Sequence, residues 1–371
     1  MSERDLARAW NAAPRTLTHH RRISPQDALG DLAAFAADGV AADSYGEGEL
    51  LERLEARLAT LLGKEAVAFM PTGTLAQQIA LRIWTDRATC KSIAFHPTCH
   101  LALHEAQAYV FLHGMRGVPL GPATELMRAG DVAALAEPVA ALLIELPQRE
   151  IGAQLLEWNE LLELCSAARS RGIKLHLDGA RLWEAQAYYR RSHAEIAALF
   201  DSVYVSFYKG IGAIAGAALA GDAATIAEAR VWQHRHGGRL VSIYPLALSV
   251  ERGLDLRLER MARYREAALR IADALRPIDG IRLLPDPPQT NTFHVFLPGE
   301  RETLETRAVA IAAERGIAIA RRFAPSGVPG FVKWEFVAGD ATLDFEPDEV
   351  ATLVRELTAA SRASAQILSA G

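Results

Sequence analysis

The feature that most constrains the fold is a regular alternation of short apolar runs with longer segments of helical periodicity. The apolar runs, which suit buried strands, lie at residues 66–70, 141–146, 173–177 and 202–206. Segments with helical periodicity precede or separate these runs. Examples are residues 50–62, which end at Gly63, and residues 158–170. Strands that alternate with helices predict an α/β domain whose mostly parallel sheet is flanked by helices.

The pattern changes after about residue 245. A long helical pattern runs from residue 247 to about 275. It is followed by strand candidates at 292–297 and 331–337, a helix that ends at Arg315, and a closing helix from Pro347. We expect a small C-terminal α+β domain at 251–371, a large domain at 41–250, and an N-terminal segment at 1–40 that contributes to a pocket or an interface.

Charge and composition argue against several classes of protein. The net charge of the 371 residues is -5, and basic residues are spread along the chain, which argues against nucleic-acid binding. The glycine- and alanine-rich run at 211–221 is too short to span a bilayer. Three cysteines without a C-x-x-C pattern, and no apolar leader at 1–15, favour a reducing, cytoplasmic location.

Two strand ends carry chemically useful side chains. Lys209 follows the run 202–206 and precedes Gly210; an apolar setting there would lower the pKa of its amine and allow a Schiff base to form. Asp178 ends the run 173–177, at the carboxyl edge where ligands of parallel sheets bind. The alternatives are a lysine that points into water and an aspartate that caps the following helix.

Two further elements could complete a cofactor site. Arg181 lies one helical turn after Asp178, where its planar guanidinium suits a carboxylate or a phenolate oxygen; a surface salt bridge is the alternative. Thr72, Gly73 and Thr74 open a helical pattern after the first apolar run. Free amides and hydroxyls at such a turn form a phosphate cradle, although the same residues often serve as a plain cap.

A histidine-rich segment lies between these elements. His100 could stack on a flat cofactor and relay protons. The order of His96, Cys99 and His104 around it matches no zinc pattern, and no second ligand group is evident, so no metal site is predicted. Together with Lys209 and Asp178, the set predicts a pyridoxal 5'-phosphate (PLP) site, because the ring of PLP needs a carboxylate against its nitrogen.

On these residues the chain resembles the threonine aldolase and β-eliminating lyase family, PLP-dependent enzymes of fold type I. The resemblance covers most of the chain from about Asp43. Its most specific match is the stretch His-Leu-Asp-Gly-Ala-Arg-Leu-Trp at 176–183, and further matches lie at 43–47, 69–79, 99–106 and 206–212.

The resemblance implies a role for each matched position. It implies that Lys209 forms the Schiff base, that Asp178 pairs with the pyridine nitrogen, and that His100 stacks on the ring. Arg181 would meet the substrate carboxylate or the ring oxygen. The phosphate would be bound by Thr72, Gly73 and Thr74.

The family typically forms homodimers or homotetramers with active sites shared between subunits. Tyr45 is therefore a candidate substrate-binding residue contributed across an interface, the alternative being a core tyrosine near a turn. Arg239, in the stretch 234–239, loosely matches a segment that reaches the cofactor phosphate.

The sequence departs from the family at three places, so the resemblance does not identify the substrate. Residues 18–24 replace the Ser-Asp-Thr segment usual near the N-terminus, and residues 145–154 contain no histidine where the aldolases carry one. Lys333 stands where a C-terminal arginine grips the substrate carboxylate; a lysine is a point charge and not a bidentate fork, and Arg321 or Arg322 could compensate.

The leading hypothesis is a PLP-dependent lyase that cleaves the Cα–Cβ bond of a threonine-type β-hydroxy-α-amino acid into glycine and an aldehyde. The base for the hydroxyl proton could be His100, Glu145, Glu150 or a water. One alternative is β-elimination on a serine, cysteine or aromatic amino acid. A PLP-fold binding protein with little turnover is another, although a binder would not need the set Asp178, Arg181 and Lys209.

Overall fold

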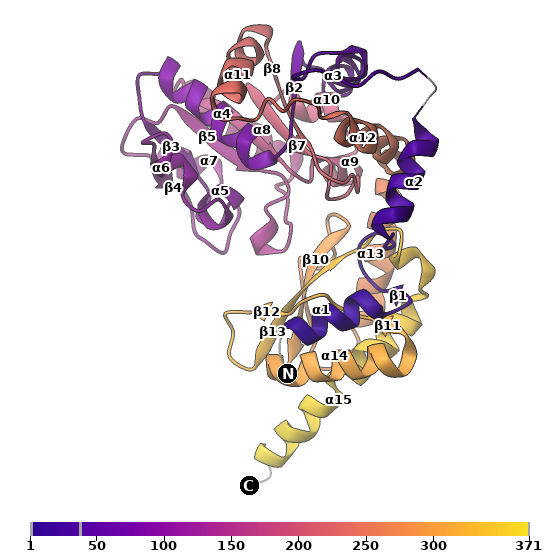
Figure 1. Ribbon diagram of the computed structural model, residues 1–371. Coiled ribbons are helices and arrows are strands. Elements are labelled where there is room, and N and C mark those ends of the chain that lie inside the picture. Colours follow the sequence, from indigo (N-terminus) through magenta and orange to yellow (C-terminus); the bar gives the residue numbers. More distant parts are fainter. Residues whose placement is uncertain (1–2, 37–38, 370–371) are drawn as a thin grey trace. The chain divides into compact units, whose positions relative to one another are not determined.

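The computed structural model describes residues 3–36 and 39–369, with side chains described from residue 4 to residue 359. The chain divides into two compact units: Ser24–Arg260, and the stretch before it together with everything from Met261 onward. Figure 1 shows the helices and strands of both units. The boundaries expected from the sequence, at residues 40 and 250, stay predictions.

The unit 24–260 is built on a seven-stranded sheet, as far as the described residues show, with the order β2-β8-β7-β6-β5-β3-β4. Its strands are β2 (Ala66–Met70), β3 (Ser92–Phe95), β4 (Arg116–Pro119), β5 (Ala141–Glu145), β6 (Lys174–Gly179), β7 (Ser202–Ser206) and β8 (Ala217–Gly221). Strand β8 runs antiparallel to both of its neighbours, and the other pairings are parallel. The carboxyl ends of the remaining strands therefore share one edge. The connection 207–216 between β7 and β8, which carries Lys209, lies at this edge.

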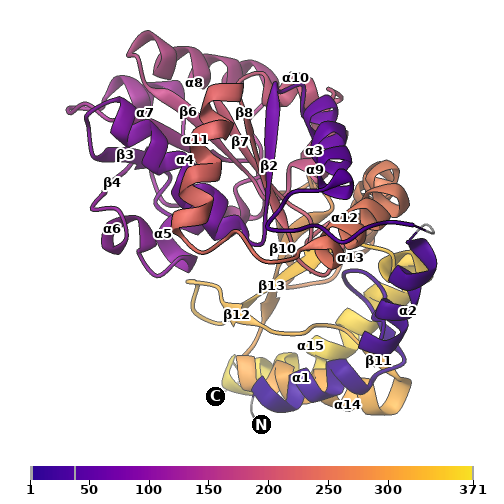
Figure 2. The same cartoon turned by 45° about the horizontal axis from the view of Figure 1, so that its top comes forward.

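Helices α4 (Gly73–Arg87) and α11 (Ala223–Arg235) cover one face of this sheet (Figure 2). Ile79 and Ile83 of α4 and Ile226 of α11 belong to one buried cluster with Met70 of β2 and Leu219 of β8. Helix α4 lies between the sheet and α11, so most of its residues are buried, among them the polar residues Gln77, Gln78 and Thr85. Helices α3 (Glu49–Leu62), α8 (Trp158–Ser170) and α10 (His193–Ala197) pack on the opposite face.

The remaining helices of this unit are short or peripheral. They are α2 (Pro25–Phe35), α5 (His100–His104), α6 (Ala108–Phe111), α7 (Ala129–Ala133), α9 (Leu182–Tyr189) and α12 (Tyr244–Arg257). The expected single helix at 247–275 is wrong: α12, a 3₁₀ turn at Leu258–Arg260 and α13 (Met261–Leu275) take its place. A single tightened turn shifts the apolar period by less than one residue, so the sequence pattern runs through the break.

The second unit is a small α+β assembly, as expected. Its antiparallel sheet has the order β12 (Ala324–Pro325), β13 (Phe331–Val337), β10 (Thr292–Pro298) and β9 (Arg282–Leu284). Buried and half-buried residues alternate along β13. Helices α1 (Glu3–Ala12), α13, α14 (Arg301–Arg315) and α15 (Pro347–Ser369) accompany it. Strand β1 (Arg15–Thr16) pairs with β11 (Ile317–Ala318) and ties the N-terminal segment to this unit.

The expected fold class is confirmed by the mostly parallel sheet with flanking helices and the separate α+β unit. Within the described ranges, no helix has both the length and the apolar character that crossing a membrane requires.

Candidate active site

Three strands deliver polar groups to one edge of the large sheet. Glu145 at the end of β5 pairs in register with Asp178 of β6, and Asp178 pairs with Tyr204 of β7. Paired residues of a parallel sheet point to the same face, so both carboxylates lie on the face that α4 covers. Lys209 follows the end of β7 at the same edge.

Asp178 is fully buried. Its Oδ2 accepts a hydrogen bond from Gln77 Nε2 at 3.0 Å, and its Oδ1 accepts one from the backbone N–H of Ala180 at 3.1 Å. Burial deprives a carboxylate of water, which hydrogen-bond donors or a cation must replace. The position therefore suits a ligand that presents a further N–H group, and the cofactor-binding role of Asp178 stays a prediction.

Lys209 carries an amine that is only moderately basic. Burial, and then the positive charge of Arg181, lower its pKa to about 8, against the opposite effect of Asp178, Glu145 and Glu184. A substantial neutral fraction near neutral pH makes the amine a nucleophile. The glycine after it has a packing reason, because a Cβ on Gly210 would lie 2.2 Å from Glu184 Oε1.

Glu145 is a second titratable group at this edge. Burial, and then the negative charge of Asp178, raise its pKa to about 7. Its Oε2 accepts the backbone N–H of His100 at 3.0 Å and its Oε1 accepts that of Arg149 at 3.1 Å. Glu145 therefore joins the end of β5 to the first residue of α5 and to the loop after β5, and it can hold or release a proton near neutral pH.

His100 is half-buried at the start of α5, and its ring is hydrogen-bonded through Nδ1 to Glu105 Oε1 at 3.0 Å. The side chain of Glu105 is fully buried and also accepts hydrogen bonds from Gln77 Nε2 at 3.0 Å and Gln78 Nε2 at 2.8 Å. Sequence reasoning missed both glutamines. The available signal was that these two polar residues interrupt an apolar stretch of α4, between Ala76 and Ile79.

The turn before α4 is shaped by close packing. Thr72 is the N-cap of α4, and its hydroxyl accepts the N–H of Leu75 at 3.3 Å. A Cβ on Gly73 would lie 1.9 Å from the hydroxyl of Tyr204, so only glycine fits there. Thr74 is exposed. Amides that open a helix have no intrahelical acceptor, so the start of this 15-residue helix suits an anion such as a phosphate, and that role stays a prediction.

Arg181 takes the N-cap position of α9 and is half-buried. Its positive charge lowers the pKa of both Glu145 and Lys209, so the guanidinium acts on the same cluster of charges. The structure thus gathers Asp178, Arg181 and Lys209 in one electrostatic neighbourhood, and the roles predicted for them stay predictions.

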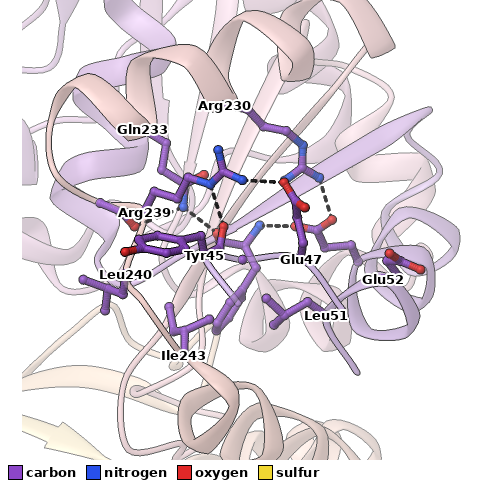
Figure 3. A pocket seen from close by; sticks show the side chains of 13 residues that line it. Tyr45, Glu47, Leu51, Glu52, Arg230, Gln233, Arg239, Leu240 and Ile243 are labelled. Carbon is purple, nitrogen blue, oxygen red and sulfur yellow. Dashed lines mark hydrogen bonds and ion pairs between the residues drawn. The ribbon is translucent and has the colours of Figure 1, made fainter. Parts of the chain in front are cut away.

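Tyr45 and Arg239 meet in a separate pocket of about 310 Å³, whose lining includes neither Lys209 nor Asp178 (Figure 3). Arg239 Nε donates to the backbone oxygen of Tyr45 at 2.6 Å, and the guanidinium also forms an ion pair with Glu47. The tyrosine itself is exposed. The predicted site residues of this unit therefore fall into two groups, and a role for this pair at the active site stays a prediction.

The other predicted positions have simpler surroundings. Lys333 lies on β13 of the second unit, opposite Phe296 of β10, and its contact with a substrate stays a prediction. His96 is buried, with Nε2 hydrogen-bonded to the backbone oxygen of Glu125 at 2.7 Å. Across the described part of the chain, no group of three or more His, Cys, Asp or Glu side chains could hold a metal ion.

The fold and the site define the class of protein. This is the fold type I architecture of PLP-dependent enzymes, with a lysine and a buried aspartate at the carboxyl edge of the sheet. The chain belongs to the beta-eliminating lyase family, whose model matches residues 24–298. The resemblance to the threonine aldolase and β-eliminating lyase group is thereby confirmed.

Solved structures and a curated relative agree with this assignment. A Listeria monocytogenes crystal structure, provisionally described as an L-allo-threonine aldolase, is 38% identical, with a TM-score of 0.91 over 96% of this chain and 99% of that one. An Exiguobacterium structure, provisionally described as an aromatic amino acid beta-eliminating lyase/threonine aldolase, is 37% identical, with a TM-score of 0.90 and the same coverage. Aldolase vrtJ of Penicillium aethiopicum is 33% identical over 210 residues, 54% of this chain and 53% of that protein. The match thus spans about half the length of this curated relative.

Proposed function

We propose that this chain is a PLP-dependent aldolase that cleaves the Cα–Cβ bond of a threonine-type β-hydroxy-α-amino acid into glycine and an aldehyde. One observation carries the proposal: an amine with a pKa of about 8 and a fully buried carboxylate occupy the same edge of the sheet. Aldol cleavage needs both a nucleophilic amine and an acid partner for an electron-accepting ring.

The residues present fit the cofactor. Gly73 leaves no room for a Cβ, and the amides that open α4 suit a phosphate. Thr72, Gly73 and Thr74 would hold the phosphate, His100 would cover the ring, and Asp178 would face its nitrogen. When bound, PLP supplies an electron-accepting ring that labilises the bonds at the substrate α-carbon.

The chain's own residues then divide the remaining work. The carboxylate of Asp178 would keep the ring nitrogen protonated, and the amine of Lys209 would hold the cofactor and carry protons at its Nζ. Arg181 binds the substrate carboxylate. Glu145, with a pKa near 7, and His100 are the groups suited to take the proton of the substrate hydroxyl at neutral pH.

The proposal extends to assembly and location. Tyr45 and Arg239 would complete the active site of a neighbouring copy in a homodimer or homotetramer, with Arg239 on the cofactor phosphate. Lys333 would bind the substrate carboxylate. Cys90, Cys99 and Cys165 are free thiols, which suits a cytoplasmic enzyme.

The test is product analysis. Purified protein is incubated with L-threonine, L-allo-threonine and phenylserine, and glycine and aldehyde are measured. Aldehyde from any of them supports the proposal, provided that Lys209→Ala abolishes both turnover and the cofactor's visible absorbance band. Absence of aldehyde from all three would overturn it.

β-Elimination is a second candidate, and one observation favours it. The loop after β5 presents Gln148 and Gln154, paired by a backbone hydrogen bond of 2.9 Å, and contains no histidine for a substrate hydroxyl. Pyruvate and ammonia from serine or cysteine, without aldehyde from threonine, would select this reaction.

A further inference from the structure

We propose that Glu105 is the positioning residue of His100, and that the amide of Gln77 joins Glu105 to Asp178 in one hydrogen-bonded unit. The inference rests on the proposed function, in which His100 would cover the cofactor ring and Asp178 would face the ring nitrogen. It adds a second group of residues, from α4 and from the end of α5, that would hold these two side chains in place.

The contacts form a continuous buried chain. His100 Nδ1 lies 3.0 Å from Glu105 Oε1, Gln77 Nε2 lies 3.0 Å from the same oxygen, and Gln77 Nε2 lies 3.0 Å from Asp178 Oδ2. Gln77 and Asp178 are almost completely inaccessible to solvent. A single amide nitrogen, with its two N–H groups, thus serves two carboxylates that lie on different elements.

The orientation of the amides follows from their neighbours. Carboxylates accept hydrogen bonds, so Gln77 and Gln78 must both turn their NH₂ groups toward Glu105. Their own oxygens, Gln77 Oε1 and Gln78 Oε1, are buried without a hydrogen-bond partner. A buried acceptor without a partner destabilises the fold, so the position of these nitrogens is maintained at a cost to stability.

The carboxylate of Glu105 also selects a tautomer of His100. A neutral imidazole donates from one nitrogen and accepts at the other, and the nitrogen that faces a carboxylate is the donor. Nδ1 of His100 therefore carries the proton, and Nε2 keeps its lone pair. A histidine held in this way has a fixed ring orientation and a free acceptor for a substrate proton.

His104 provides a contrast on the same short helix. Its ring centroid lies 5.2 Å from that of His100, but its Nε2 faces Glu150 at 3.1 Å, at a partly exposed position. The two rings are therefore expected to hold opposite tautomers. The proton of His104 serves as an internal reference in any measurement on His100.

The first experiment needs no cofactor. The ring nitrogens of ¹⁵N-histidine-labelled apoprotein are observed by NMR, with His100→Asn used to assign the signals. We expect the Nδ1–H tautomer for His100 in the wild type, and loss of this preference in Glu105→Gln with the His104 signals unchanged. An unaltered tautomer of His100 in Glu105→Gln would overturn the proposal.

The second experiment separates the two glutamines. Gln77→Met and Gln78→Met each remove one donor to Glu105 with little change in volume, but only Gln77 also serves Asp178. We expect kcat to fall roughly 10- to 100-fold in Glu105→Gln and Gln77→Met with KM little changed, and several-fold less in Gln78→Met. Equal effects of Gln77→Met and Gln78→Met would overturn the link to Asp178.

The two proposals fail separately. A changed tautomer in Glu105→Gln in a protein that releases no product would sustain the positioning role and reject the proposed function. Normal aldehyde release, with kcat unchanged in Glu105→Gln, would sustain the proposed function and reject the positioning role. Glu105→Asp, which restores the carboxylate, is expected to recover part of the lost activity.

Discussion

The edge around Lys209 and the pocket around Arg239 use the same kinds of charged side chain in opposite ways. In the pocket, each guanidinium has its own carboxylate: Arg239 pairs with Glu47, and Arg230 pairs with Glu55 at 2.6 Å (Figure 3). The side chain of Glu47 is 78% exposed, and water screens such pairs. At the buried edge, charges share partners and their pKa values move toward neutrality. Burial thus brings the pKa values of Glu145 and Lys209 close to neutral pH, where these groups can gain or lose a proton.

The largest effect that tests this comparison is expected at Asp178. Asp178→Asn removes the charge and leaves one acceptor oxygen for the two donors, Gln77 and Ala180. The kcat is therefore expected to fall roughly 10³-fold, as when a preorganised electrostatic group is lost. Aldehyde release measures it. Asp255→Asn, which breaks the exposed ion pair with Arg57, is the matched control and should leave kcat within about threefold. Comparable losses in both variants would erase the distinction between buried and exposed charge.

Buried histidines extend this contrast between buried and exposed charge, because they make the stability of the fold depend on pH. Burial lowers the pKa of His113, His176 and His193 to about 4. Between pH 6.5 and about 4 the unfolded chain therefore binds protons that the folded protein does not. Stability falls with decreasing pH in this window, by about 1.4 kcal/mol per pH unit for each histidine. Urea unfolding at several pH values measures this slope.

A substitution measures how much His176 contributes to this dependence of stability on pH. His176 Nδ1 lies 2.8 Å from the hydroxyl of Ser202, which also accepts a hydrogen bond from Trp84 Nε1 at 2.8 Å. The amide of Asn at position 176 can either donate to or accept from this hydroxyl, and it cannot titrate. His176→Asn should reduce the slope by about one histidine's share. An unchanged slope would show that His176 does not contribute.

The amine of Lys209 should respond to its neighbouring charge. Competitive acetylation of the apoprotein, followed by mass spectrometry, is expected to give a pKa of about 8 for Lys209. In Arg181→Leu the pKa should rise by roughly one unit, because a repelling positive charge is gone. Arg181→Lys retains the charge and should stay close to the wild type. If Arg181→Leu and Arg181→Lys gave the same pKa for Lys209, the charge at position 181 would not be the cause of the lowered pKa.

The smallest effect is expected in the exposed pocket. Glu47→Gln removes the ion pair with Arg239 and should lower the free energy of unfolding by less than about 1 kcal/mol, with the difference shrinking further in high salt. Thermal unfolding at two salt concentrations measures it. A loss of several kcal/mol would place this pocket in the same energetic class as the buried edge.

Much of the fold was predictable because it depends on local periodicity. The strand at 202–206 and the helix at 158–170 match β7 and α8 residue for residue. Asp178 and Lys209 drew notice because Asp178 directly follows one apolar run and Lys209 comes shortly after another. These patterns need no knowledge of which strands are neighbours.

The missed features depend on contacts between distant parts of the chain. Gln77 meets Asp178 across 101 positions of sequence, and Arg239 meets Tyr45 across 194. Strand order decides such meetings, and nothing in the local pattern states that β8 lies between β2 and β7. The break at 258–260 was hidden for a different reason, since a single tightened turn barely changes the apolar period.

The antiparallel course of β8 has a mechanical consequence for Lys209. Ser206 and Ala217 are paired across β7 and β8, so the ten residues between them form the tip of a hairpin with both stems in the sheet. Trp183 Nε1 anchors one stem through the backbone oxygen of Ser206 at 2.8 Å, and Phe207 N–H closes the tip onto Gly216 at 3.2 Å. Lengthening this tip by one residue would displace the amine by roughly 3.3 Å, about the length of a hydrogen bond. Drift in loop length during evolution is therefore expected in other connections of the domain and not in this one.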